Sequence, residues 1–398
     1  MTTFGRKIFE SIITAVIVIM AYIAAVIVLV TEQKWLFLAE LAAIIVLIAL
    51  IHFSGRTSSC INLKDRNKPI FYGTLIFCAL TFPLVIGIGG FGNESIIGVT
   101  ALAGIYICLS LALNVTVGFV GLLDLSIAAF YAVGAYSAAI LTTTFPQFWW
   151  IAWAGIPVAI AAGWLLAIIV GLPALRLRGD YFAIVTLAVT GMVHRFAVNL
   201  RGVTRGDLGI HGVPPFKLGS LSLSAPLHIG SLTLPSDVKA YYFIVVIVLI
   251  VAYIGYQIHN SRIGRAWVAV REDEIAAQAM GIDTYRFRFL AYLLMASLAA
   301  ICGALYACII GSVTPGEFTY MNTVFVMCMV VLGGMGNIKG VMLGAFILYV
   351  LPEKFQELGS DRMMYFGLAM VIMMILRPQG FLPSKRRSLE LGFERNNR

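Results

Sequence analysis

Long apolar runs separated by short polar stretches are the main pattern of this chain. Clear examples are Ile12–Val30, Trp35–Ile51, Tyr241–Tyr256 and Phe289–Ile310. Each is long enough for an α-helix to cross about 30 Å of hydrocarbon, and none alternates apolar with polar residues as the strands of a membrane barrel do. Backbone polar groups in lipid must bond within the protein. The pattern therefore predicts an all-α polytopic integral membrane protein.

Composition and charge bear on the number and orientation of the spans. Of the 398 residues, 60% are hydrophobic and 12% charged, and the mean hydropathy is +0.94; in soluble domains roughly a quarter of the residues are charged. Lys and Arg gathering in cytoplasmic loops explain the net charge of +9 without a nucleic-acid partner. Placing the basic loops inside predicts about 10–12 transmembrane helices, both termini in the cytoplasm, and residues 199–239 outside.

The polar segment 259–288 interrupts the apolar pattern between two long runs. It holds five arginines and four carboxylates, and its acidic run is followed by IAAQAMGI, a proline-free stretch that favours a short helix. At helical spacing Glu274, Ala277, Gln278 and Gly281 share one face. Because Ala277 and Gly281 make this face shallow, we expect another protein to approach it closely, with the Glu274 carboxylate fixing the register.

A second interpretation of segment 259–288 is an amphipathic helix that lies on the lipid headgroups. Such helices need a bulky apolar face, and the segment offers only Trp267 and Met280 for it. Docking of a partner protein is the interpretation that the sequence favours.

Motifs for catalysis and metal binding are missing from the sequence. There is no Gly-Lys dipeptide and hence no P-loop, no HExxH and no GxSxG, and the six cysteines form no CxxC pair. We therefore expect no catalytic residue, metal site or cofactor on this chain. A chain with a docking segment and no nucleotide site needs an ATPase on a partner chain.

Two glycine-rich stretches, Gly118–Ser126 and Gly333–Gly340, interrupt apolar sequence. Transporter pathways favour such broken helices, and Asp124 adds a carboxylate close to apolar sequence on both sides. Alternatively, Asp124 caps the following helix with help from Ser126, and the glycines permit tight helix packing. The candidate translocation-path residues are Gly121, Asp124, Ser126, Gly333, Gly334 and Gly336.

Several blocks of sequence resemble the LivM-type permease subunits of branched-chain amino-acid ABC importers. Segment 259–288 is similar to the coupling loop of ABC importer permeases, in which EAA is followed by three residues and Gly: Ala276, Ala277 and Gly281 fit, whereas Ile275 stands in place of Glu. The other blocks follow in the order of the family: GLLDLSIAAFYAVGAYSAAIL (121–141), LPALRLRGDYFAIVTLAVTGMVHR (172–195), TRGDLGI (204–210), VVLGGMGNIKGVMLGA (330–345) and RPQGFLP (377–383).

The resemblance implies an ABC importer permease fold and ATP-driven uptake of Leu, Ile and Val, and of other hydrophobic amino acids, across the inner membrane. It implies three kinds of partner besides membrane lipid: a LivH-like permease subunit, two cytoplasmic ATPase subunits that bind the ATP, and a periplasmic amino-acid-binding protein. The residues expected to couple to the ATPase are Arg271, Glu272, Glu274, Ala276, Ala277 and Gly281. A urea or short-amide permease and an ion-coupled secondary transporter are the alternatives.

Three regions are expected along the chain. Residues 1–69 form an extra N-terminal pair of transmembrane helices and a cytoplasmic loop, residues 70–383 form the permease domain with its coupling loop, and residues 384–398 form a basic cytoplasmic tail.

Overall fold

A computed structural model describes residues 94–148, 150–177, 180–218, 221–222, 227–229, 232–234, 236–354 and 367. The expected N-terminal helix pair and the basic tail lie outside the described residues. Among the described residues, 94–98 and 228–238 belong to one compact unit, and 99–227 with 239–354 to a second. The candidate site residues all lie in the second unit.

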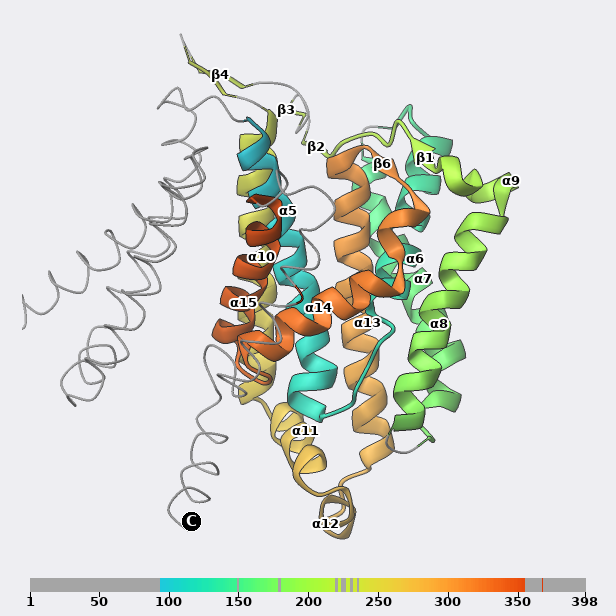
Figure 1. Ribbon diagram of the computed structural model, residues 1–398, viewed down its shortest axis with the longest axis vertical. Coiled ribbons are helices and arrows are strands. Elements are labelled where there is room, and N and C mark those ends of the chain that lie inside the picture. Colours follow the sequence, from blue (N-terminus) through green and yellow to red (C-terminus); the bar gives the residue numbers. More distant parts are fainter. Residues whose placement is uncertain are drawn as a thin grey trace, which may run out of the picture. The chain divides into compact units, whose positions relative to one another are not determined.

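Helices make up nearly all of the described chain (Figure 1). Six of those described are long and apolar enough to cross a membrane. The chain is thus an all-α polytopic membrane protein, as predicted. The long helices are α5 (Glu94–Leu113, continued by the π-helix η1, Asn114–Val120), α6 (Ile127–Thr144), α7 (Ile151–Ala174), α8 (Asp180–Asn199), α10 (Ser236–Asn260) and α13 (Thr284–Ile310).

Shorter elements connect these helices. The short helices are α9 (Arg201–Thr204), α11 (Arg262–Glu272), α12 (Glu274–Ala279), α14 (Tyr320–Gly333), α15 (Ile338–Lys354) and the 3-10 turns η2 (Gly206–Leu208) and η3 (Pro315–Phe318). Three two-stranded pairs complete the list: β1 (Ile210–His211) with β6 (Ser312–Val313), β2 (Lys217–Leu218) with β3 (Leu221–Ser222), and β4 (Leu227–Ile229) with β5 (Leu232–Leu234).

Small residues hold α6, α7 and α13 together. A Cβ built on Gly134 would lie 2.5 Å from the Cα of Ala300, and one on Gly303 would lie 2.6 Å from the backbone nitrogen of Ala135. Gly163 of α7 approaches Ala300 in the same way. The hydrophobic effect does not hold helices together in lipid. Close backbone contact of this kind stabilises their association instead, through van der Waals packing.

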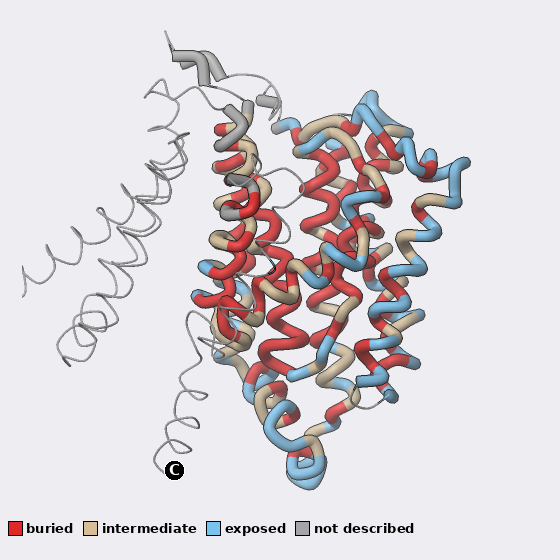
Figure 2. Tube along the Cα trace, in the orientation of Figure 1, coloured by how far each residue is buried: buried red, intermediate tan, exposed pale blue. Residues whose placement is uncertain are grey.

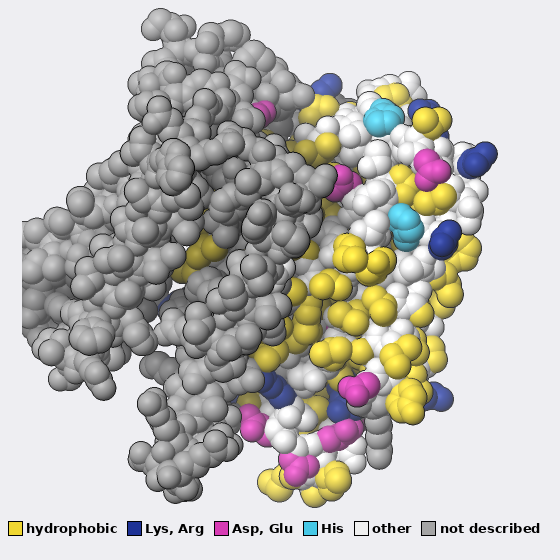
Figure 3. All heavy atoms as spheres, viewed as in Figure 1, with side chains coloured by type: hydrophobic (Ala, Val, Ile, Leu, Met, Phe, Trp, Pro, Cys, Tyr) yellow, Lys and Arg dark blue, Asp and Glu magenta, His cyan; other side chains and the backbone are white. Residues whose placement is uncertain are grey.

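Large apolar side chains are exposed along α7, α8 and α10. Figure 2 shows the exposed positions of α8, and Figure 3 shows hydrophobic side chains over the visible face of the bundle. Exposure of many large apolar side chains to water is unfavourable. Such a surface is suited to contact with lipid or with a partner helix. Examples are Leu165, Ile169, Ile184, Phe196, Ile250 and Tyr253.

Within the second unit, α11 and α12 lie at one end of the helices, and α9, β1 and β6 at the opposite end (Figure 1). The two polar segments that the sequence predicts on opposite sides of the membrane therefore emerge from opposite ends of the bundle.

Candidate functional site

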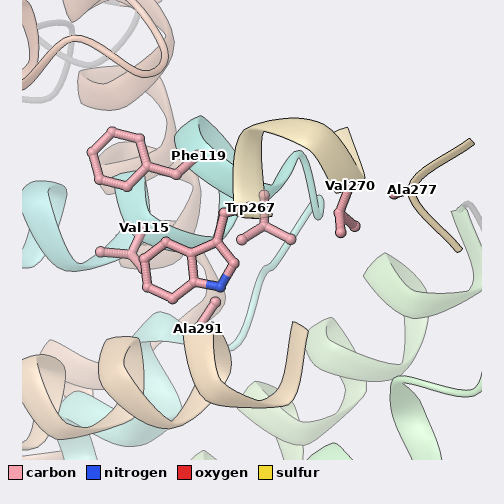
Figure 4. Packing of buried hydrophobic residues seen from close by; sticks show 7 residues of the cluster. Val115, Phe119, Trp267, Val270, Ala277 and Ala291 are labelled. Carbon is pink, nitrogen blue, oxygen red and sulfur yellow. The ribbon is translucent and has the colours of Figure 1, made fainter. Parts of the chain in front are cut away.

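Helix α11 is anchored to the bundle by Trp267. Ser261 begins the helix by accepting a hydrogen bond from the Gly264 N–H (3.3 Å). Trp267 is fully buried, and its indole N–H donates to the carbonyl of Phe287 (2.8 Å). It packs in one cluster with Val115 and Phe119 of η1 (Figure 4). Trp267 is therefore an internal anchor and is not available to lie on lipid headgroups.

Helix α12 begins at an acidic cap. The Asp273 carboxylate accepts hydrogen bonds from the backbone N–H groups of Ile275 (2.8 Å) and Ala276 (3.0 Å). A carboxylate at this position satisfies otherwise unpaired donors and suits the positive end of the helix dipole. The predicted short helix is present, and it is set by this cap.

Two residues of the face of α12 predicted to dock a partner, Glu274 and Ala277, contact the chain itself, whereas Gln278 and Gly281 are exposed. Docking of a partner on this face stays a prediction. Ala277 is 4% exposed. Glu274 Oε2 lies 2.8 Å from Arg288 Nη2, and Gln278 Nε2 donates to Thr284 Oγ1 (2.9 Å). These contacts attach the loop to the start of α13. The helix supplies the Arg288 guanidinium opposite Glu274 and the Thr284 hydroxyl opposite Gln278.

Gly281, the last residue of the predicted docking face, lies in the turn that follows α12. It is exposed, a Cβ built on it would meet nothing within 4 Å, and its φ is +84°. An L side chain is strained at this angle. Gly281 therefore serves the turn from α12 to α13.

The outward face of α12 carries large apolar side chains instead. Ile275 is 79% exposed and Met280 83% exposed, with Ala276 and Ala279 beside them, also exposed. Hydrophobic and acidic side chains share this tip of the molecule (Figure 3). Ile275 was predicted only as a departure from the EAA pattern and not as part of an exposed surface, although a large apolar residue in the most polar loop is a usable signal. Such a patch is typical of a contact with a partner protein or with a membrane surface.

The two glycine-rich stretches are breaks between helices, as predicted, and they touch each other. The π-helix η1 ends at Gly121, whose φ is +79°. The backbone N–H of Gly336 donates to Asn114 Oδ1 (2.8 Å), and a Cβ built on Gly118 would lie 2.6 Å from the Gly336 nitrogen. Only side-chain-free backbone fits this approach.

Gly333 and Gly334 serve the turn between α14 and α15. A Cβ built on Gly333 would lie 2.6 Å from the carbonyl oxygen of Gly340, and Gly334 follows the last residue of α14. Gly333 thus fits the alternative of tight helix packing.

Arg271 connects segment 259–288 to these breaks. Its Nη1 donates to the carbonyl of Gly118. A Cβ built on Gly121 would lie 2.8 Å from Arg271 Cγ, and one on Gly336 would lie 3.3 Å from Arg271 Nη1. The sequence analysis treated Arg271 and the glycines as separate sites, and the structure joins them. Glu272, the neighbouring coupling-loop candidate, is exposed at the end of α11.

Asp124 is fully buried in the loop before α6. Its Oδ1 accepts from the Ser126 N–H (2.9 Å) and from Ser126 Oγ–H (2.5 Å), and Ser126 Oγ lies 3.2 Å from Tyr292 Oη. Neither side chain caps the first turn of α6. Burial raises the pKa of the Asp124 carboxyl to about 6, against the opposing effect of the hydrogen bonds from Ser126.

A small cavity of about 10 Å³ lies beside η1, with room for roughly one water molecule. Asn114 is its polar lining residue, and the Nδ2 of this buried side chain has no hydrogen-bond partner. The other lining residues are apolar: Leu111, Val115, Phe119, Val251, Ile254, Gly255, Ile258, Leu294, Leu298 and Ile338.

A bundle of apolar helices with broken segments and an apolar-tipped polar loop defines a membrane transport component. Comparison of the sequence with family models identifies the particular family: residues 95–377 match the permease component of branched-chain amino acid transport systems, and the chain belongs to this family.

Individual relatives agree with this assignment. LivM, the high-affinity branched-chain amino acid transport system permease protein of Escherichia coli (strain K12), is 37% identical over 338 residues, 81% of this chain and 77% of that protein. LivM of Salmonella typhimurium is 36% identical over 359 residues, 86% of this chain and 82% of that protein. LivH of Escherichia coli (strain K12) is 25% identical over 297 residues, 72% of this chain and 93% of that protein. No solved structure matches the chain.

Proposed function

We propose that this chain is one of two permease subunits of an ATP-driven importer that moves leucine, isoleucine and valine into the cytoplasm. Its partners are a LivH-like permease subunit, two cytoplasmic ATPase subunits that bind ATP, and a periplasmic binding protein that delivers the amino acid. It lies in the bacterial inner membrane with both termini in the cytoplasm. The chain itself needs no cofactor.

The observation that carries this proposal is the exposed apolar tip of α12. Ile275 and Met280 project from a loop that is otherwise polar, on a chain that carries no P-loop. Exposed Glu272, Asp273 and Asp283 flank the tip. An ATPase groove that is apolar at its base and basic at its rim would complement both features.

The substrate class is supported by the chemistry of the spans. A neutral amino acid with an apolar side chain needs few charges along its route, and the Asp, Glu, Lys and Arg residues of the described spans, such as Asp180, Asp237 and Arg286, lie near the span ends. An ion-coupled transporter places more ionisable residues within its spans.

Purified complex in proteoliposomes tests the function. Labelled leucine should enter only when ATP and the binding protein are both supplied. Uptake driven by a proton or sodium gradient without ATP would move the protein to the secondary transporters. Urea uptake without leucine uptake would favour the short-amide alternative.

Cysteine accessibility tests the orientation. Single cysteines in 262–286 should react from the cytoplasmic face, and those in 204–236 from the opposite face. Labelling of both segments from one side would contradict the proposed topology.

A further inference from the structure

The side chain of Arg271 reaches from the coupling loop to the point where the two helix breaks meet. It contacts Gly118 in the first break, through the hydrogen bond to the carbonyl, and lies against Gly336 in the second. The first break, in η1, and the second, in the α14–α15 turn, are joined by the hydrogen bond from the Gly336 N–H to Asn114 Oδ1, across 222 residues of sequence. One cationic side chain therefore contacts both breaks at once.

We propose that Arg271 is a positioning residue for transport, which ties the movement of α11 to the joined breaks at η1 and at the α14–α15 turn. This role rests on the import function proposed above. A docked ATPase pushes or pulls α12 and α11, and the guanidinium passes that displacement to the Gly118 carbonyl. The breaks respond because they are the places in the bundle where helical hydrogen bonding already changes.

Three features suit Arg271 to this task. The guanidinium is planar and always charged, and it offers several donors in a fixed fork, so one side chain can hold a carbonyl firmly. The Gly118 carbonyl lies near the C-terminal end of η1, where a cation is favoured by the helix dipole. The Trp267 anchor at the middle of α11 keeps this helix against η1, so motion of α11 is transmitted and not absorbed by a loose loop.

The glycines make the contact possible and define where it would fail. A Cβ on Gly336 would lie 3.2 Å from the Gly118 oxygen, the same atom that accepts the hydrogen bond from Arg271. A Cβ on Gly121 would lie 2.8 Å from the Arg271 side chain. Added side chains there would push Arg271 away without touching the docking tip of α12.

The test compares Arg271→Gln with Arg265→Gln in the reconstituted complex. Arg265 is a matched control on the same helix, because it is exposed and donates to the carbonyl of Asn260 (3.1 Å), away from the breaks. We expect Arg271→Gln to lower leucine uptake at least tenfold while the ATPase subunits still co-purify and still hydrolyse ATP. The ATP consumed per leucine should rise several-fold. Arg265→Gln should leave this ratio unchanged, and Arg271→Lys should recover part of the uptake.

Hydrogen exchange supplies a second measurement that does not depend on transport. In the wild-type complex, a non-hydrolysable ATP analogue should change amide protection in 114–121, and in Arg271→Gln this change should be lost. If uptake, hydrolysis and assembly all fall together in Arg271→Gln, the residue is only structural and the proposal is wrong. The proposal is also wrong if the variant keeps the wild-type ratio and exchange response. Absence of ATP-driven uptake by the wild type would contradict the import function instead, and the exchange comparison would still decide whether Arg271 ties the loop to the breaks.

Discussion

Different kinds of contact hold the α6–α7–α13 packing and the α11–α12 loop. The helices meet through backbone, with glycine and alanine at Gly134, Ala300 and Gly303. The loop is held by a few large side chains, chiefly Trp267 and the Glu274–Arg288 pair.

The difference shows which part can move. Contacts spread over many small residues must be broken together, so the three helices act as one rigid body. The loop has a small number of attachment points, and each can be removed by one substitution. Coupling to an external ATPase would require such a combination: a rigid group of helices, and a loop that moves with the ATPase and is attached to the helices at a few residues.

The largest effect is expected inside the rigid body. Gly303→Leu forces a side chain against the backbone of α6, where the Ala135 nitrogen lies 2.6 Å from a Cβ on this glycine. Overpacking that only backbone shifts can relieve costs about 3 kcal/mol or more. Monodisperse protein in size-exclusion chromatography should be lost. Gly191→Leu on α8, where a Cβ meets nothing within 4 Å, is the control and should behave as wild type; equal behaviour of the two variants would contradict the rigid-body view.

Removal of the main anchor of the loop should have the next largest effect. Trp267→Ala deletes a fully buried indole and its hydrogen bond to Phe287, at a cost of about 3–5 kcal/mol. We expect limited proteolysis to cleave within 259–288 far faster, while the transmembrane fragments stay intact. Trp150→Ala removes an indole that is 48% exposed and should not speed cleavage. Unchanged proteolysis of Trp267→Ala would show that the loop has other strong attachments.

A smaller, pH-dependent effect is expected at Asp124, where the rigid body meets the breaks. Its carboxyl pKa is raised from 3.8 to about 6 by burial. The folded chain therefore binds a proton that the unfolded chain has released, and stability falls as pH rises from about 4 to about 6 and then levels off. Asp124→Asn keeps an acceptor for Ser126 without a charge and should remove this fall. The gain in the free energy of unfolding over wild type should be larger at pH 8 than at pH 4.5, by on the order of 1 kcal/mol. Melting temperatures measured at the two pH values check this. A variant that is less stable at pH 8 would mean that the carboxylate has an undetected favourable partner.

The outward face of the loop should matter for docking and not for stability. Met280→Asp changes a side chain that is 83% exposed, so the free energy of unfolding should change by less than about 0.5 kcal/mol and the melting temperature should stay close to that of the wild type. Co-purification of the ATPase subunits should drop at least tenfold, because a charge enters an apolar contact. Ala276→Ser, a small change beside it, should be tolerated in both measurements. Retention of the ATPase by Met280→Asp would place the docking surface elsewhere.

Much of this arrangement was predictable from the sequence, and the rest depended on distant contacts. Apolar runs were enough for the membrane helices, and the acidic run with its proline-free stretch was enough for α12. The inward face of α12 was not predictable, since it is set by Arg288 and Thr284 of the next helix. Glycine-rich composition identified both breaks, but their contact joins Asn114 to Gly336. A single sequence carries no signal for a pairing across that separation.

The π-helical segment η1 allows the side chains of the first described span to take two different rotational positions around the helix axis. Each N–H in such a turn bonds one residue further back than in an α-helix. Conversion of one turn to α would advance every later side chain by one position, about 100° around the axis. All seven residues of η1 are buried, so a slip of this kind must repack Phe119 against Trp267. A one-residue deletion within η1 is therefore unlike any substitution there: conversion of the π turn to an α turn offsets it, so the later side chains can keep their positions.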